Sequence, residues 1–213
     1  MSKEMQDVTV NRFRLKRGRG LAEKINGIGQ ELGRPVRILD IGGRPDYWKN
    51  VPYQNVEKIV LLNNEEAELH RSTESALFER VLGDARNLET HAAGSFDLVH
   101  SNSVIEHVGQ WWDMQAMARE ALRVGLHGWI QTPAWGFPIE PHYRIPFAHW
   151  MPAPLRREYI RMSPGYRNLS LSERRMHVDR INLLTFAEFS LLFTNKHIIR
   201  EKLLLTKSFV ATW

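Results

Sequence analysis

The sequence has no cysteine in its 213 residues, so disulfide bonds, thiolate metal sites and cysteine nucleophiles are excluded. It also lacks long apolar runs, because no stretch reaches the roughly 18 residues that a transmembrane helix needs. Residues 1–7 have none of the apolar core of a secretory signal. We therefore expect no transmembrane segment, and the absence of cysteine fits a reducing, cytoplasmic location.

Internal repeats and low-complexity tracts are absent too, and nothing in the sequence indicates an oligomeric state. The composition, with 43% hydrophobic and 25% charged residues, is ordinary for a globular protein. The length is sufficient for one domain with its own core. We expect a single domain over residues 1–213, in which residues 1–20 form a basic N-terminal segment that is either partly disordered or a leading helix.

Positive charge is in excess, with a net charge of +5, and arginine supplies most of it. It concentrates in residues 12–19 and in residues 156–180. Two interpretations stay open: both regions are solvated basic faces, or they attract an anionic partner such as phosphate, nucleic acid or a lipid headgroup. Neither region alternates aromatic with basic side chains, as the surface of a single-strand-binding protein does.

Short apolar runs alternate with helical patterns from residue 21 onward. A parallel sheet with helices on both faces has this pattern. We expect helices at residues 21–32, 112–124 and 185–193, the last begun by a capping box from Thr185 to Glu188. The expected strands are residues 37–41, 58–62, 80–84, 95–101, 128–132, 197–205 and 208–213, with a turn at Thr206 and Lys207 between the last two.

Residues 133–155 break this pattern with six prolines, which forbid a long helix or a central strand. Aromatic residues and two histidines lie among the prolines. A loop of this composition is more often a binding surface or a lid than a linker. The residues that follow are rich in arginine and partly helical in pattern. We therefore expect a substrate cap over residues 133–182, inserted after the fifth strand.

Four segments stand in the order and spacing of the motifs of the class I S-adenosylmethionine (SAM)-dependent methyltransferases, which the chain resembles after residue 35. They are Arg37–Gly43 with its Asp-Ile-Gly-Gly turn, Val81–Leu88, Phe96–Val108 with the run Ile-Glu-His-Val, and Arg119–Gly125. The resemblance implies an α/β fold with a doubly wound, mainly parallel seven-stranded sheet that ends in a C-terminal antiparallel hairpin. It also implies SAM as the cofactor.

The glycine turn departs from the family pattern. Three glycines usually follow the acid, and here Arg44 and Asp46 stand in the second and third of these places. The methionine part of SAM is then held less by bare backbone and more by a side chain such as that of Arg44, which can pair with a carboxylate. The second strand ends in Asn63 where an acid usually binds the ribose hydroxyls, and an amide is a weaker, neutral acceptor.

The resemblance places the cofactor-binding residues at the ends of the first four strands. Asp40 would order the glycine turn or contact the amino group of the methionine part, and Asp84 would bind the adenine amino group with Ala85 against the ring. Ser101 would contact SAM through its backbone, where the fourth strand opens onto the cofactor. The full predicted set is Asp40, Gly42, Gly43, Arg44, Asn63, Asn64, Asp84, Ala85, Ser101 and Asn102.

His107, His142 and Glu140 are the candidate catalytic residues. His107 follows the fourth strand, where relatives often place a histidine near the transferred methyl group, and an imidazole can take a proton from a hydroxyl near neutral pH. His142 and Glu140 are a candidate base and its partner in the cap. The alternatives are a structural histidine at position 107 and a proline-stiffened loop that packs its aromatic side chains on the sheet.

Trp135, Tyr143 and His149 are the candidate substrate contacts from the cap. Glu140, His142 and His149 are also residue types that bind metals. A loop supplies no fixed helical geometry for ligands, however, so we expect no bound metal.

Three functions fit these observations. The first is SAM-dependent methylation of a small-molecule or glycan-type acceptor, with oxygen as the favoured methylated atom because the cap offers several histidines and an acid. The second, suggested by the basic charge but not favoured, is a nucleic-acid methyltransferase; residues 101–104 lack the Asn/Asp-Pro-Pro-aromatic signature of the enzymes that methylate amino groups of nucleic acids. The third is a non-catalytic binding protein on the same scaffold, suggested by the altered glycine turn.

Overall fold

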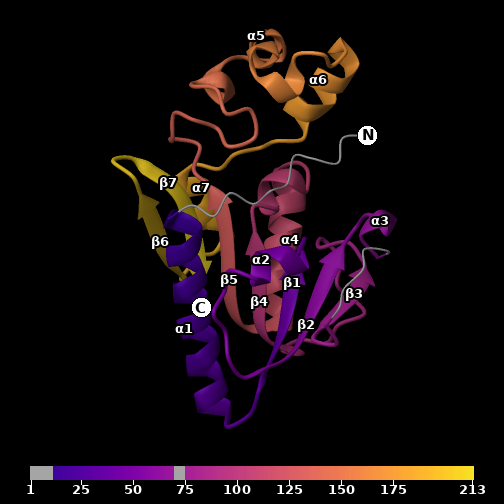
Figure 1. Cartoon of the computed structure of the whole chain (residues 1–213), viewed down its shortest axis with the longest axis vertical. Coiled ribbons are helices and arrows are strands. Elements are labelled where there is room, and N and C mark those ends of the chain that lie inside the picture. Colours follow the sequence, from indigo (N-terminus) through magenta and orange to yellow (C-terminus); the bar gives the residue numbers. More distant parts are fainter. Residues whose placement is uncertain (1–11, 70–74) are drawn as a thin grey trace.

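The computed structural model describes residues 12–69 and 75–213, and its seven-stranded sheet has the order β3-β2-β1-β4-β5-β7-β6 (Figure 1). The first five strands run parallel, and β7 pairs antiparallel with both β5 and β6. The predicted α/β fold with a reversed C-terminal hairpin is confirmed. The strands are β1 (Val36–Ile41), β2 (Val56–Asn63), β3 (Phe78–Leu82), β4 (Phe96–Asn102), β5 (Gly125–Pro133), β6 (His197–Lys202) and β7 (Thr206–Thr212).

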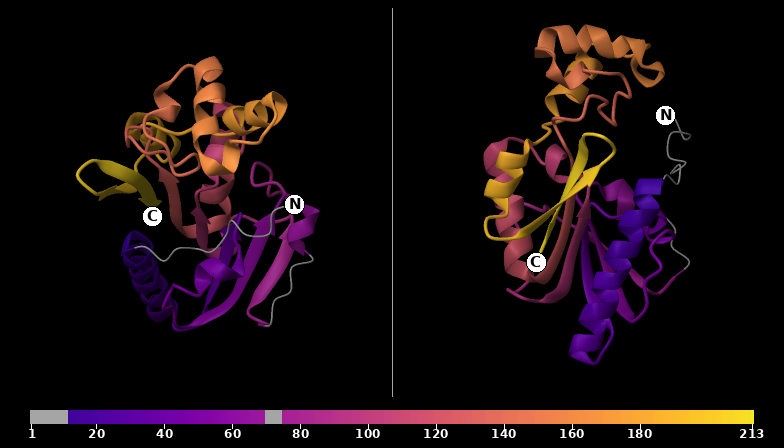
Figure 2. Two further views of the ribbon diagram at one scale, coloured as in Figure 1. Left: turned by 45° about the horizontal axis from the view of Figure 1, so that its top comes forward. Right: turned by 90° about the vertical axis from the view of Figure 1, so that its left-hand side faces the viewer.

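Helices cover both faces of the sheet (Figure 2). On one face, α1 (Arg12–Leu32) and α2 (Pro45–Trp48) pack in one core cluster with β1, β2 and β4. On the other face, α4 (Trp111–Val124) and α7 (Phe186–Leu192) form the second cluster. Because successive side chains of a strand point to opposite faces, Leu39 packs with the α4 cluster while the next residue, Asp40, reaches Trp48 of α2.

The start of the first helix and the turn of the closing hairpin differ from the prediction. α1 begins at Arg12, so part of the basic N-terminal segment is helical, while residues 1–11 lie outside the described residues. The turn of the closing hairpin is at residues 203–205, and Thr206 and Lys207 belong to β7. Their polarity suggested a turn, but the backbone carbonyl of Lys207 accepts a hydrogen bond of 3.0 Å from Ala134, which keeps these residues in the sheet.

α7 begins as the sequence predicts, with a capping box. Thr185 Oγ1 accepts a hydrogen bond of 3.3 Å from the Glu188 backbone N–H, and the Glu188 carboxylate accepts one of 2.7 Å from the Thr185 backbone N–H. The short α3 (Glu66–Leu69) follows β2. No helix within residues 12–69 and 75–213 has the length and apolar character needed to cross a membrane.

The chain between β5 and α7 lies beyond the carboxyl ends of the parallel strands (Figure 1). It contains α5 (Ala153–Tyr159) and α6 (Leu171–Asp179), joined by short 3₁₀ turns. This part, which we call the cap, has a small core of its own that includes Tyr143, Ile160 and Tyr166. The cap therefore stands over the edge of the sheet at which ligands of such folds bind.

Many of the cap arginines bond within the cap. Arg157 and Arg175 pair with Asp179 at 3.2 and 3.3 Å, and Arg161 and Arg174 pair with Glu158 at 3.3 and 3.0 Å. Arg156 donates to two backbone carbonyls of the same segment. These contacts favour the interpretation of residues 156–180 as an internally paired, solvated surface over that of a nucleic-acid-binding surface.

Replacing Asp97 with alanine is expected to lower the free energy of unfolding by about 2 kcal/mol, because the Arg37 backbone N–H and the Arg34 guanidinium lose their acceptor. Arg34 donates two bonds of 2.8 and 2.7 Å to this carboxylate, and Arg37 donates a third of 2.8 Å. Burial raises the pKa of Asp97, but these bonds outweigh it and hold the pKa below its usual range. The contribution is therefore full above about pH 4 and is lost as the pH falls below that value.

Urea unfolding followed by circular dichroism at pH 7 and pH 3 measures this effect. The matched control is Glu89→Ala, which removes an exposed carboxylate from the loop before β4 and should leave the unfolding midpoint unchanged. Equal stability of Asp97→Ala and Glu89→Ala would contradict the prediction.

Candidate active site

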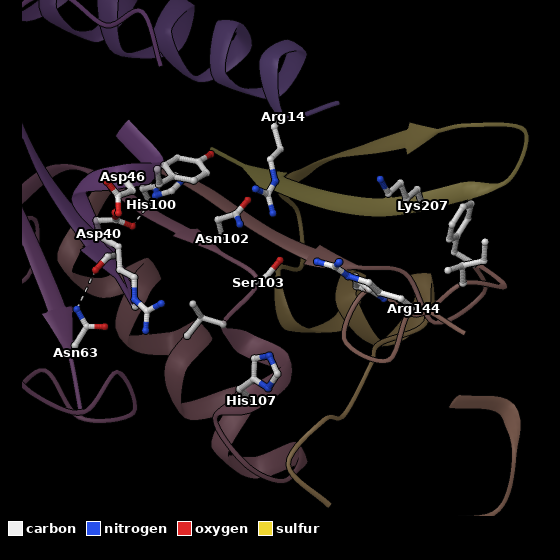
Figure 3. A pocket seen from close by; sticks show the side chains of 18 of the residues that line it. Arg14, Asp40, Asp46, Asn63, His100, Asn102, Ser103, His107, Arg144 and Lys207 are labelled. Atoms are coloured by element: carbon white, nitrogen blue, oxygen red, sulfur yellow. Dashed lines mark hydrogen bonds and ion pairs between the residues drawn. The ribbon is translucent and has the colours of Figure 1, made fainter. Parts of the chain in front are cut away.

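A cavity of about 930 Å³ opens between the carboxyl ends of the strands and the cap (Figure 3). A smaller cavity of about 150 Å³ adjoins it beside β2 and β3. The two share Gly42, Asn63, Val104 and His107 in their walls, so they form one continuous groove across the ends of the first four strands. In a doubly wound sheet this is the place where a nucleotide-containing ligand binds.

The glycine turn after β1 lies in the wall of this groove. Gly42 has a φ of 68°, and a Cβ atom there would lie 2.5 Å from Val104 Cγ2. A Cβ atom on Gly43 would lie 2.0 Å from Asp40 Oδ2. Both positions thus require glycine, the first for its backbone conformation as well as for space. The turn leaves bare backbone next to the cavity, although the family's other two glycines are replaced.

Asp40 supports the glycine turn from inside the protein. Its side chain is 1% exposed, and Trp48 Nε1 donates a hydrogen bond of 2.7 Å to Oδ2. His100 Nδ1 lies 2.6 Å from Oδ1, on the neighbouring strand β4. Of the two roles predicted for Asp40, these contacts favour ordering of the turn over direct contact with a ligand. The contacts of Asp40 with Trp48 and His100 were not predicted from the sequence.

The two unusual residues of the turn region have partners within the protein. Arg44 forms an ion pair of 2.7 Å with the largely buried Glu68 after β2. Asn63 donates a side-chain hydrogen bond of 2.9 Å to the Gly43 carbonyl. The amide of Asn63 thus ties the end of β2 to the glycine turn, a contact that a carboxylate in its place could not make because it has no donor. Both residues also line the larger cavity.

The smaller cavity contains the remaining residues predicted at the ends of β2 and β3. Asn64, Asp84 and Ala85 all line it. Asp84 pairs with Arg86 at 2.6 Å, and the hydrogen bonds from Arg86 hold the pKa of Asp84 below its usual range. Asp84 is therefore a charged acceptor at neutral pH, which suits recognition of an amino group.

The two predicted residues at the end of β4 differ in position. Asn102 lines the larger cavity, but its side-chain oxygen accepts a hydrogen bond of 2.6 Å from Arg17 of α1. Ser101 is fully buried, donates its hydroxyl to the Ile41 carbonyl at 3.2 Å, and lines neither of these two cavities. Ser103, which follows, has a φ of 56° and does line the larger cavity.

The three predicted catalytic residues lie together. His107 stands in a 3₁₀ turn after β4 and lines both cavities, and its Nε2 lies 2.8 Å from Nε2 of His142 in the cap. His142 Nδ1 is hydrogen-bonded to the fully buried Glu140 carboxylate, which also accepts from the backbone N–H groups of His142 and Tyr143. The chain Glu140–His142–His107 therefore runs from the interior of the cap to the cavity wall.

The pKa values of His107 and His142 are shifted in opposite directions. Loss of water around the ring and the charge of His142 lower the pKa of His107 to about 4. Burial lowers the pKa of His142, but its hydrogen bond with Glu140 and the charge of that residue outweigh this and raise it. His107 is therefore neutral near pH 7, and His142 is the ring of the pair that holds an additional proton more readily.

Glu106 is a further buried acid next to this chain, and the sequence did not single it out as catalytic. It is 0% exposed, and Thr132 Oγ1 donates a hydrogen bond of 2.9 Å to its Oε2. Burial raises the pKa of Glu106 to about 7. Glu106, His107 and His142 each offer one ligand atom within 4.8 Å of the others, so these residues could hold a metal ion.

The predicted substrate contacts lie away from the larger cavity. Tyr143 is 0% exposed in the core of the cap, where it packs against Tyr166. His149 is buried and its Nε2 faces the Trp135 carbonyl at 2.8 Å, while Trp135 lines a separate hollow beside α7. None of these three side chains lines the larger cavity, so their assignment to substrate binding stays a prediction that the geometry of this cavity does not support.

Other cap residues take the place of these contacts. Phe137, Ile139, Pro141 and Arg144 line the larger cavity, and all belong to the proline-rich loop in which contacts were expected. Arg14 of α1 and Lys207 of β7 line it too, and Figure 3 shows that these two cations and Arg144 reach the same side of the cavity. Burial and, after it, the nearby charge of Arg17 lower the pKa values of Arg14 and Lys207.

Comparison with known proteins agrees with this geometry. Residues 39–128 match the family described as "Methyltransferase domain", a segment that includes the glycine turn and β4. Among curated proteins no match is found.

Solved structures share the fold. A protein from Nostoc punctiforme PCC 73102, described as a candidate O-methyltransferase, is 17% identical with a TM-score of 0.55, over 93% of this chain and 56% of that one. This chain thus spans little more than half the length of that protein. The N-terminal domain of EvdMO1 with SAH bound is 17% identical with a TM-score of 0.55, over 95% of this chain and 80% of that one. A chain of the complex between the Haloferax volcanii Trm112 methyltransferase activator and a methyltransferase is 11% identical with a TM-score of 0.54, over 93% and 92%.

Residues 39–128 thus match a methyltransferase domain, and the strand order around them is that of the Rossmann-like methyltransferase fold. The identities of the solved structures are low enough that they bear on the fold only. The resemblance predicted from four sequence motifs is confirmed over this segment.

Proposed function

We propose that the protein transfers a methyl group to a hydroxyl oxygen of a small-molecule or glycan-type acceptor. The observation that carries this proposal is the chain Glu140–His142–His107, which ends in the cavity wall beside the glycine turn. A hydroxyl must lose its proton during methylation, so it requires a group that assists this loss. A carboxylate or a deprotonated amine has no proton that must leave. Methylation of either group would therefore not need the hydrogen-bonded series Glu140–His142–His107.

The residues of the groove fit SAM. The backbone of Gly42 and Gly43, where the protein leaves no room for a side chain, would approach the cofactor. Asn63 would offer its side-chain oxygen to the ribose hydroxyls, since its amide nitrogen is bonded to Gly43. Asp84 and Ala85 would hold the adenine in the smaller cavity. When bound, SAM supplies a methyl group activated by its sulfonium charge.

The cap would hold the acceptor and exclude water. Phe137, Ile139 and Pro141 present apolar surface to the cavity opposite the strand ends. Proline fixes the backbone of this loop, so little conformational freedom would be lost when an acceptor binds. Holding the acceptor oxygen at a fixed place beside His107 would supply much of the acceleration, because proximity and orientation are large terms in such bimolecular transfers.

Three cations favour an acceptor that carries an acidic group, such as a uronic acid or a sugar phosphate. Arg14, Arg144 and Lys207 come from α1, the cap and β7, and all line the same cavity. Replacing Arg144 with glutamine is expected to raise the KM for an acidic acceptor about tenfold, the effect of about 1.4 kcal/mol of lost attraction, with little change for a neutral analogue. Steady-state kinetics with a uronic acid and the corresponding neutral sugar measure this difference.

The matched control is Arg175→Gln, because Arg175 is an exposed cap arginine that lies away from the cavity. It should leave both KM values unchanged. If Arg144→Gln raised the KM of the neutral sugar as much as that of the acid, Arg144 would act through the shape of the cap and not through its charge.

An acceptor screen tests the proposed function. Purified protein is incubated with SAM and with panels of sugars, uronic acids, sugar phosphates, small alcohols, amines and oligonucleotides, and the release of S-adenosylhomocysteine is measured. Product mass and fragmentation then locate the methyl group. Methyl ethers from the sugar or alcohol panels are expected, whereas turnover confined to amines or oligonucleotides would overturn the proposal.

A further inference from the structure

The ring nitrogens of His107 and His142 make an unusual contact. Nε2 of one ring lies 2.8 Å from Nε2 of the other, with the ring planes 88° apart. On the far side of each ring, Nδ1 faces a group that can only accept: Glu140 for His142, and the Arg180 backbone carbonyl, at 3.3 Å, for His107. Each Nδ1 therefore carries a proton, and the two Nε2 lone pairs point at one another. A shared proton or a cation must lie between them.

Glu106 adds a third ligand atom at this place. Its Oε2 is bonded to Thr132, while Oε1 is buried and has no hydrogen-bond partner within the described part of the chain. A buried carboxylate oxygen without a partner is costly unless a proton or a cation neutralises the group. One atom each from Glu106, His107 and His142 lie within 4.8 Å of one another. Zinc ligands at bond lengths of about 2.0 Å lie about 3.3 Å apart in a tetrahedron, so only small movements would complete such a site.

The three ligands are held by the surrounding structure. The imidazole of His142 donates from Nδ1 to a carboxylate and that of His107 to a backbone carbonyl, which is the arrangement that orients histidine ligands in metal sites. The turn that contains Glu106 is tied to the chain after the cap, because Asn182 donates its backbone N–H to the Glu106 carbonyl at 2.9 Å. The side chain of Asn182 donates in addition to the Gly109 carbonyl at 2.8 Å.

We propose that Glu106, His107 and His142 bind a divalent transition-metal cation, with Glu140 as the carboxylate that orients His142. Two imidazoles and one carboxylate suit zinc and its neighbours in the periodic table, whereas magnesium prefers oxygen ligands. The sequence suggested a different trio from the cap loop and gave no reason to expect a metal. The structure instead combines one cap histidine with the turn after β4, which the linear sequence does not reveal.

The cation would lie in the cavity wall, because His107 lines both cavities. A three-residue ligand set leaves a coordination position open, and an acceptor oxygen can complete it from the cavity. Coordination lowers the pKa of a hydroxyl, whose proton then passes to solvent. This role, unlike metal binding itself, rests on the proposed methylation of a hydroxyl.

Isothermal titration of the full-length protein with zinc chloride, after removal of metals with a chelator, tests the proposal. We expect one site per chain with a Kd below about 10 μM, weaker at pH 5.5 than at pH 7.5 because protons compete for the imidazoles. Glu140→Gln, which keeps all three ligands, is expected to weaken binding at least about tenfold. His142→Ala should abolish it. His197→Asn is the matched control, since His197 is exposed on the edge strand β6 and should bind zinc as the unaltered protein does.

Circular dichroism establishes that each variant is folded, and titration with SAM in the same preparations separates the two proposals. Absence of saturable zinc and cobalt binding, or equal affinity in His142→Ala and His197→Asn, would overturn the metal site. If the metal-free protein bound SAM and methylated hydroxyls as fast as the zinc-loaded protein, the role of the cation in activating the acceptor would be overturned while the proposed function stayed intact. If the protein bound zinc but methylated no hydroxyl, the metal site would stand and the proposed function would be overturned.

Discussion

Replacing Gly42 with alanine is expected to weaken SAM binding about 100-fold or more while the protein stays folded. Gly42 has a φ of 68°, a region that costs other residues about 1 kcal/mol or more. The added Cβ would also lie 2.5 Å from Val104 Cγ2. The turn or Val104 must therefore move, and both line the two cavities in which the cofactor is expected. Isothermal titration with SAM and with S-adenosylhomocysteine measures the loss.

Gly27→Ala is the matched control for this experiment. A Cβ at Gly27 of α1 meets nothing within 4 Å, so alanine should leave binding unchanged and raise stability, by about 1 kcal/mol on helix propensity. The double variant Gly42→Ala with Val104→Ala is expected to recover part of the affinity, because it removes the clashing methyl groups but not the backbone strain. Equal SAM affinity of Gly42→Ala and Gly27→Ala would show that the turn is not in contact with the cofactor.

The glycine turn could be predicted because its signal is local in the sequence. An apolar run that ends in an acid and two glycines defines a strand and a turn, and the later strands carry signals of the same kind. β1, β2, β4 and β5 were placed within a few residues of their observed ends for this reason. Parallel order then brings the ends of these strands to one edge of the sheet, which places most of the predicted cofactor residues in the groove.

The partners of those residues could not be predicted, because they come from distant parts of the chain. Arg44 was expected to meet a carboxylate of the cofactor, and it meets one from Glu68 of the protein. Asn102 was expected to contact SAM, and its side chain accepts from Arg17, which in turn pairs with Glu201, 184 residues away. A charge pattern in the sequence indicates that arginines will form ion pairs. It does not indicate which acidic residues the fold brings next to them.

The directions of the side chains in the cap could not be predicted from the sequence either. Tyr143 and Arg144 are neighbours in the proline-rich loop, yet the first is fully buried in the cap and the second lines the cavity. In an irregular loop no fixed period separates inward from outward positions, as it does in strands and helices. The residue types in the loop were thus informative about its role as a wall of the cavity. The individual residues assigned to substrate binding, Trp135, Tyr143 and His149, do not line that cavity.

Replacing His107 with asparagine is expected to lower kcat by about 100-fold or more, with SAM affinity changed by less than about threefold. His107 is the member of the chain Glu140–His142–His107 that lines the cavity, and activation of a hydroxyl requires that ring whether it handles a proton or a cation. Asparagine keeps a polar side chain of similar size, so the turn after β4 should be preserved. Steady-state kinetics with a hydroxyl acceptor, and SAM titration of the same preparation, measure the two quantities.

The control is His197→Asn, which changes an exposed histidine of β6 and should leave kcat unaltered. Comparison of the change in kcat with the change in SAM affinity shows on which side of the groove His107 acts. Loss of turnover together with loss of SAM binding would place His107 on the cofactor side of the groove, where it lines the smaller cavity as well. Loss of turnover with intact binding would place it on the acceptor side. An unchanged kcat would mean that the imidazole pair only links the turn after β4 to the cap, and acceptor activation would then have to come from another group in the cavity.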